Sequence, residues 1–75
     1  MKEKLIRILT EVCPGVDFET ETALIDGGVL ESLDIVAIVT ELREEFGADI
    51  GVDDLLPENF NSADDMLSLL RRKLG

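Results

Sequence analysis

Ser32 carries the hydroxyl group that is the best candidate for a reactive atom in this chain. It lies in the run DGGVLESLD, residues 26–34, where a loop is expected to turn into a helix. The first N–H groups of a helix have no partner within it and the helix dipole is positive there, so the position favours a phosphate. Because the surrounding acids make a free phosphate a poor fit, the pattern favours one that is covalently attached. The alternative is that Ser32 is only the N-cap of the helix, a common role for serine.

Few other side chains could do chemistry. The chain has no histidine and one cysteine, which excludes the usual zinc clusters, a Ser-His-Asp set and a Cys-His pair. Cys13 follows the apolar residues of the first predicted helix, so we expect a buried, inert thiol. The acids of residues 49–54 lack the correctly placed glycine and the closing glutamate of an EF-hand loop. We therefore expect neither a metal site nor catalysis by the polypeptide alone.

The net charge is −10, and almost all basic residues are near the two ends of the chain. Arg43 is the only base between residues 8 and 70, and every acid except Glu3 lies in that stretch. Such a surface repels phosphate backbones and anionic lipids and attracts proteins that present Lys and Arg. We expect protein partners, a monomer, and no binding to nucleic acid or insertion into a membrane. Because no long apolar run follows the N-terminal lysines, we expect no signal peptide and a cytoplasmic protein.

A chain of 75 residues is expected to form one domain, residues 1–75, with a thin core. Its apolar residues recur at helical spacing, which predicts an all-α fold. The first helix is predicted over about Lys2–Val12, stops at Pro14-Gly15, and has an apolar face of Leu5, Ile6, Leu9, Val12 and Cys13. A long acidic loop, Val16–Glu31, leads to Ser32 and is expected to anchor in the core through Val16, Phe18, Leu24 and Ile25.

The second helix is predicted over about Ser32–Phe46 and ends at Gly47, a favourable residue after a helix. At about 100° per residue, its apolar side chains fall within one arc of about 160°. These side chains are Ile35, Val36, Ile38, Val39, Leu42 and Phe46. The acids Asp34, Glu41, Glu44 and Glu45 share the opposite side. The width of the apolar arc predicts that this is the central helix.

Residues 50–60 predict a short helical turn and a connector, because Pro57 prevents a longer helix. The last helix is predicted to begin at Ser62-Ala63-Asp64-Asp65, a sequence close to a capping box, and to run to about Lys73. Its apolar stripe consists of Ala63, Met66, Leu67, Leu70 and Leu74. The expected architecture is three main helices plus one short helix.

Residues 31–47, ESLDIVAIVTELREEFG, make the chain resemble the acyl carrier and peptidyl carrier superfamily. Members of that superfamily are four-helix bundles with Asp-Ser-Leu at the start of the second helix. The likeness extends over nearly the whole chain, through the acidic loop with its glycine, the segment Ile50-Gly51-Val52 and the Asn61-Ser62 pair. The resemblance implies an acyl-carrier-like four-helix bundle and a protein that is not an enzyme.

The resemblance also implies a cofactor. A phosphopantetheinyl transferase would move 4′-phosphopantetheine from coenzyme A onto Ser32 Oγ, and acyl groups would be carried as thioesters on its terminal thiol. Leu33 would anchor the turn beneath the serine. The implied partners are this transferase, an adenylating enzyme that loads an acyl or aminoacyl group, and acyl-accepting enzymes. One residue departs from the family pattern, because Glu31 stands where Asp is usual, which puts in question how readily a generic transferase modifies Ser32.

Partner enzymes are expected to bind around the start and along the acidic side of the second helix. The residues concerned are Glu31, Leu33, Asp34, Ile35, Glu41, Glu44 and Glu45. Charges at the rim of an interface mainly speed encounter and select partners, which suits repeated binding and release. The alternative for the acids is a solvated face without a partner. Ile35 and Ala37 are either a small apolar contact patch or part of the core.

The passage Pro57-Glu58-Asn59-Phe60-Asn61-Ser62 is closer to D-alanyl carrier proteins and free-standing aminoacyl carriers than to fatty-acid carriers. It makes D-alanine the favoured cargo. A fatty chain would gain about 0.8 kcal/mol per buried CH₂ inside the bundle, whereas an ammonium group would lose hydration there. A hypothesis of another class is an acidic helical adaptor that binds a basic protein and never carries a prosthetic group.

Overall fold

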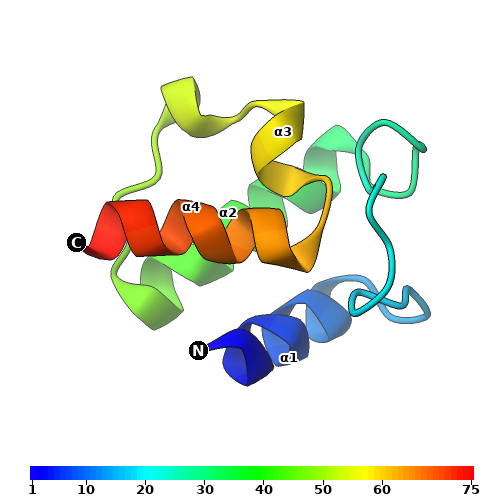
Figure 1. Cartoon of the computed structure of the whole chain (residues 1–75), viewed down its shortest axis with the longest axis horizontal. Helices are drawn as coiled ribbons and strands as arrows, with labels where there is room; N and C mark the ends of the chain where they lie inside the picture. The colour runs from blue at the N-terminus through cyan, green and yellow to red at the C-terminus, as the bar shows by residue number, and fades with distance from the viewer.

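The computed structural model describes all 75 residues, and its regular secondary structure is entirely helical. The elements are α1 (Lys2–Val12), α2 (Ser32–Phe46), a single 3₁₀ turn η1 (Val52–Asp54), α3 (Pro57–Phe60) and α4 (Ala63–Leu74) (Figure 1). The predicted all-α bundle of three main helices and one short helix is confirmed. None of these helices is long and apolar enough to span a bilayer.

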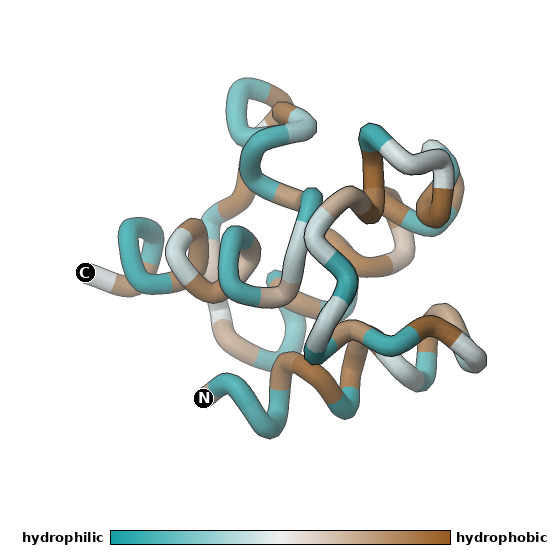
Figure 2. The backbone as a smooth tube through the Cα atoms, turned by 45° about the vertical axis from the view of Figure 1, so that its right-hand side comes forward, coloured by the Kyte–Doolittle hydropathy of each residue, from teal (hydrophilic) through white to brown (hydrophobic).

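The core lies where the three long helices meet. In Figure 1, α4 crosses in front of α2, and α1 lies below both; α1 contacts each of them, and α3 contacts α4. In Figure 2 the hydrophobic stretches of α1 face the other helices and its hydrophilic stretches face outward. Side chains from all three helices are completely buried there: Leu5, Leu9, Ile38, Leu42, Met66 and Leu70. Burying each such side chain contributes about 1.5–3 kcal/mol.

The helix ends follow the predicted signals. Gly47 adopts the left-handed conformation with φ 67°, and its N–H donates to Arg43 O, which ends α2. Ser62 caps α4, because its Oγ accepts a hydrogen bond of 3.0 Å from the N–H of Asp65. Pro57 is the first residue of α3, where its missing N–H costs nothing.

The predicted apolar faces are correct in the centre and wrong at the margins. Ile8 and Leu69 are buried although they lie outside the predicted stripes, because α1 contacts two helices and α4 is contacted by both α1 and α3. Leu74 belongs to the predicted stripe of α4 but is 43% exposed, since it is the last residue of that helix. Val36 was placed in the apolar arc of α2, yet it is 59% exposed. Its flank of α2 faces η1, which contributes no buried residue.

Candidate functional site

Ser32 is the first residue of α2, and its side chain is free. The residue is exposed, and its Oγ makes no hydrogen bond within the protein. The N-cap is Glu31 instead, whose N–H donates to Asp34 Oδ2 at 3.0 Å. The alternative that Ser32 is the N-cap is therefore wrong. Because Asp34 stabilises the start of the helix, the serine hydroxyl is available for other chemistry.

The loop before Ser32 is fixed by buried side chains. Phe18, Leu24 and Leu30 are each at most 5% exposed, and the N–H of Leu30 donates to Leu24 O at 2.8 Å. Phe18 and Leu24 were predicted as anchors, and the other predicted anchors, Val16 and Ile25, are partly buried against the core. Leu30 was not predicted, yet it lies only two residues before Ser32 and holds that end of the loop in the core.

Asn61 ties this loop to the far end of the chain. Its Oδ1 accepts hydrogen bonds of 3.0 Å from the N–H groups of both Ile25 and Asp26. Its Nδ2 donates to Asp26 Oδ2 at 3.0 Å, and its carbonyl oxygen accepts from the N–H of Leu24 at 2.9 Å. Four hydrogen bonds from one residue therefore hold residues 24–26 against the junction of α3 and α4. From the sequence, Asn61 is recognisable only as a residue that introduces the last helix.

The two consecutive glycines are required by the path of the loop. The N–H of Gly27 donates to Ala23 O at 2.6 Å, and a Cβ on Gly27 would lie 2.6 Å from that same oxygen. Gly28 has φ 72°, in the left-handed region that other residues rarely adopt. Both positions keep the turn tight where it approaches Leu30 and Ser32.

The predicted partner-binding residues divide into two groups. Glu31, Leu33 and Glu44 are exposed, whereas Ile35 is half-buried against the core. Leu33 was predicted to anchor the turn beneath Ser32, but it is 81% exposed. The reason is helix geometry: Leu33 precedes the fully buried Leu42 by nine residues, which places it on the opposite side of α2, at about 180°.

The remaining acids of α2 lie on its flank toward α1. Glu45 forms an ion pair of 3.8 Å with Lys4, whose Nζ also donates to Glu45 O at 3.2 Å and lies 5.1 Å from the centre of the Phe46 ring. Asp34 is half-buried and bonded to the backbone of Glu31, and Glu41 is also half-buried. Glu44 and Glu45 are exposed, whereas Asp34 and Glu41 are half-buried, so the four acids do not form one fully open surface.

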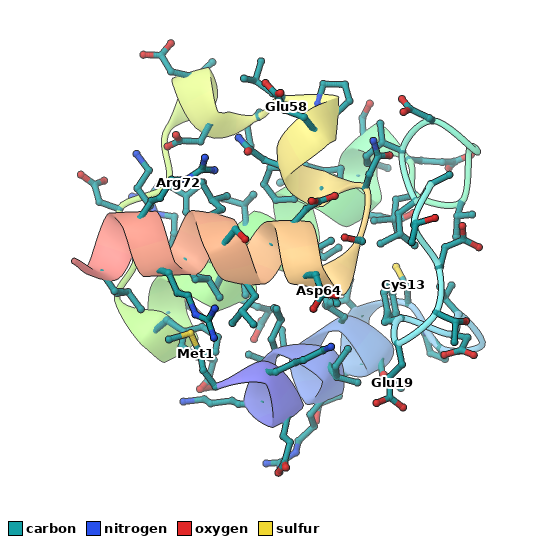
Figure 3. The ribbon with its side chains drawn as sticks, in the orientation of Figure 1. Met1, Cys13, Glu19, Glu58, Asp64 and Arg72 are labelled. Carbon is teal, nitrogen blue, oxygen red and sulfur yellow. The ribbon has the colours of Figure 1, made fainter.

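Cys13 lies just after α1 and is partly buried, less so than was predicted (Figure 3). Burial raises the pKa of its thiol, and the nearby carboxylate of Asp34 raises it further. The thiol is therefore protonated at neutral pH and a poor nucleophile. This agrees with the predicted inert role.

An apolar groove runs along the side of α2 that carries Ser32. Its α2 wall consists of Val36, Val39, Thr40 and Arg43, and its other wall of Ile50, Gly51, Val52 and Leu55. The groove has a volume of about 330 Å³. A smaller hollow of about 90 Å³ lies between Ile25, Ile35, Leu55, Leu56, Pro57 and Phe60.

The chemistry that this site can do is narrow. No group of three His, Cys, Asp or Glu side chains is placed to hold a metal ion. What the site offers is an unbonded hydroxyl on the surface, at the positive end of a helix, on a loop that is fixed in the core. These properties fit a phosphodiester link to a prosthetic group, which needs an accessible oxygen and tolerates no burial.

Comparison with known proteins gives one match. The chain matches the family described as the phosphopantetheine attachment site over residues 3–73. No curated protein and no solved structure matches it. Domains of this family are non-catalytic carriers that receive 4′-phosphopantetheine on a serine, are modified by phosphopantetheinyl transferases and interact with acyl-handling enzymes. Because the match runs from the first turn of α1 to the last turn of α4, the protein belongs to the phosphopantetheine-attachment family of carrier proteins.

Proposed function

We propose that Ser32 is the serine that carries the 4′-phosphopantetheine arm, and that residues 1–75 act as a single carrier domain. The observation that supports this most is the free, exposed Oγ at the start of α2, in a chain that matches the family from end to end. The only other serines are less suitable. Ser62 is occupied as the N-cap of α4, and Ser68 lies inside that helix.

The attachment reaction consumes coenzyme A. A bond forms between Ser32 Oγ and the phosphorus next to pantetheine, the pyrophosphate bond of coenzyme A breaks, and 3′,5′-ADP leaves. The hydroxyl proton passes to a base of the transferase, since this chain has no histidine and no base bonded to Ser32. The product is a phosphodiester with a terminal thiol, on which an acyl or aminoacyl group is held as a thioester.

The cargo that we propose is an aminoacyl group, with D-alanine as the first candidate. The sequence of residues 57–62 supports it through its resemblance to D-alanyl carriers. An ammonium-bearing cargo would stay outside the core, where it keeps its hydration.

The experiment that tests the attachment site is intact-mass spectrometry after incubation with coenzyme A and a broad-specificity transferase. We expect one phosphopantetheine increment on the wild type and on Ser68→Ala, and none on Ser32→Ala. A full increment on Ser32→Ala would overturn the proposal.

The cargo is tested on the loaded protein. Adenylating enzymes are supplied with D-alanine, with L-amino acids or with fatty acids, and the thioester is measured by mass. Loading with a fatty acid but not with D-alanine would show that the proposed cargo is wrong while leaving the attachment site intact.

A further inference from the structure

The connector Gly51–Leu56, which contains η1, is held in an unusual way. None of its residues is buried, and its three large apolar side chains are exposed: Val52 by 84%, Leu55 by 41% and Leu56 by 45%. Apolar burial therefore contributes little to its position. Something else must hold this segment against the bundle.

Polar contacts with α4 supply that hold. Asp54 Oδ2 accepts a hydrogen bond of 2.9 Å from the N–H of Gly51 and forms an ion pair of 2.7 Å with Lys73 Nζ. One carboxylate thus closes the turn of the connector and links it to the last helix. The ion pair is partly shielded, since the two side chains are only 31% and 18% exposed.

A second link runs through Asn59, the only buried polar residue of the protein. Its Nδ2 donates to the carbonyl oxygen of Asp54 at 2.8 Å, and its Oδ1 accepts from Arg72 Nη2 at 2.9 Å. Arg72 projects from α4 toward η1 and α3 (Figure 3). Two consecutive residues of α4, Arg72 and Lys73, therefore fix the connector through Asp54.

The connector forms one wall of the apolar groove, and that groove lies beside Ser32. Val36, Val39 and Arg43 follow Ser32 by four, seven and eleven residues, so the four side chains lie along one side of α2. Opposite them stand Val52 and Leu55. An enzyme that reaches Ser32 or its arm has to cover this end of α2, next to the groove.

We propose that Asp54 and Lys73 are positioning residues for partner docking: they hold Val52 and Leu55 across from Val36, and this pair of walls receives an apolar side chain of the partner enzyme. The inference rests on the proposed function of Ser32. Neither Asp54 nor Lys73 needs to touch the partner, because both act through the connector.

The charges around the groove favour a protein partner with a basic rim. The exposed acids Glu44 and Asp53 directly follow the groove residues Arg43 and Val52 in the sequence, and the only base that lines the groove is Arg43, whose Nη1 donates to Ile50 O at 3.4 Å. An apolar anchor surrounded by Lys and Arg would complement this surface. Val36 and Val52 line the groove but remain 59% and 84% exposed, so the groove is open and suits a protein surface better than an enclosed small ligand.

The test compares Lys73→Met and Asp54→Ala with a matched control. Lys2→Met breaks a different ion pair to α4, that between Lys2 and Asp64 at 3.0 Å, without touching the connector. Lys73→Arg keeps the charge and is the rescue variant. For each protein we would measure KM and kcat with the transferase, the methyl NMR signals of Val52 and Leu55 without any partner, and the free energy of unfolding in urea.

Lys73→Met and Asp54→Ala should raise the transferase KM about three- to tenfold with kcat within about twofold, and should shift the Val52 and Leu55 methyl signals. Lys2→Met should change neither the transferase KM nor the methyl signals, and Lys73→Arg should have the KM of the wild type. If the wild type loads normally and Lys73→Met has an unchanged KM, this inference is overturned but the proposed function of Ser32 is not. If attachment of the arm shifts the methyl signals of Val52 and Leu55 when no partner is present, the arm itself occupies the groove, and this result would also contradict the inference. A wild type that takes no arm would overturn the proposed function itself.

Discussion

Two irregular segments flank α2, and they are held by different forces. The loop Val16–Glu31 before it buries three large side chains and shares four hydrogen bonds with Asn61, donating three of them and accepting one. The connector Gly51–Leu56 after it buries none and is held by the polar contacts that its own Asp54 makes with Lys73 and Asn59. A fully buried apolar side chain contributes about 1.5–3 kcal/mol, which is more than an ion pair near the surface contributes, because water and salt screen the pair. The loop therefore fixes Ser32 through contacts in the core, whereas the surface beside Ser32 is held in position by polar contacts.

Two leucines on either side of Ser32 differ strongly in burial. Leu24 is fully buried in the loop, and Leu33 is 81% exposed one residue after Ser32. Leu24→Ala should lower the free energy of unfolding by about 3 kcal/mol, because it leaves a cavity in the core. Leu33→Ala should change it by less than about 0.5 kcal/mol. Urea unfolding measures both, and similar losses in the two variants would show that the loop is not anchored as described.

The next effect concerns the polar anchor of the loop. Asn61→Ala removes the acceptor of the Ile25 and Asp26 N–H groups, so we expect a loss of about 2 kcal/mol. Hydrogen exchange of these two amides should become much faster. Amides that stay protected in the variant would mean that Asn61 does not hold the loop. The Gly51 amide, which bonds to Asp54, is the internal control and should not change.

The connector should show a smaller effect, because the contribution of Asp54 to stability depends on pH. The hydrogen bond from Lys73 and that from the Gly51 N–H lower the pKa of Asp54 below its usual value of 3.8. Because the folded-state pKa is the lower one, the carboxylate stabilises the fold above the unfolded-state pKa, and this contribution is lost as the pH falls through the folded-state pKa. In Lys73→Met the pKa of Asp54 should rise toward 3.8, measured by carboxyl NMR titration. An unchanged pKa would contradict the assigned ion pair.

The smallest expected effect on stability is at Val52. Val52→Ala removes a side chain that is 84% exposed, so the free energy of unfolding should change by less than about 0.5 kcal/mol. If the connector serves partner docking, the same variant should still raise the transferase KM. A clear loss of stability would instead mean that Val52 packs against the bundle.

The helices of this protein could be predicted from sequence because their signals are local. Gly47 ends α2 and Ser62 caps α4 through contacts within four residues, and the spacing of Leu5, Leu9, Ile38 and Leu42 marks the core. The prediction that the Ser32 hydroxyl is accessible was also correct. The alternative, that Ser32 is the N-cap, could be excluded only with the hydrogen bond between Glu31 and Asp34 that the structure shows.

The long-range contacts could not be predicted. Asn61 forms hydrogen bonds with Ile25 and Asp26, which precede it by 36 and 35 positions. Lys73 forms an ion pair with Asp54, whereas the sequence indicated only that it offsets the negative end of the α4 dipole. The exposure of Val36 depends on the connector opposite it, which periodicity along α2 does not describe. Leu33 is the exception, because its position opposite Leu42 on the helical wheel could have corrected the prediction from sequence alone.

Ser32 Oγ is fixed by the loop and left unbonded by the capping of α2, and we propose that it carries the arm. Tandem mass spectrometry of the peptide that contains residues 26–34, after loading from coenzyme A, tests it most directly. We expect the phosphopantetheine group on Ser32 and on no other residue. The group on Ser62 or Ser68, or no group on any peptide of the folded protein, would contradict it.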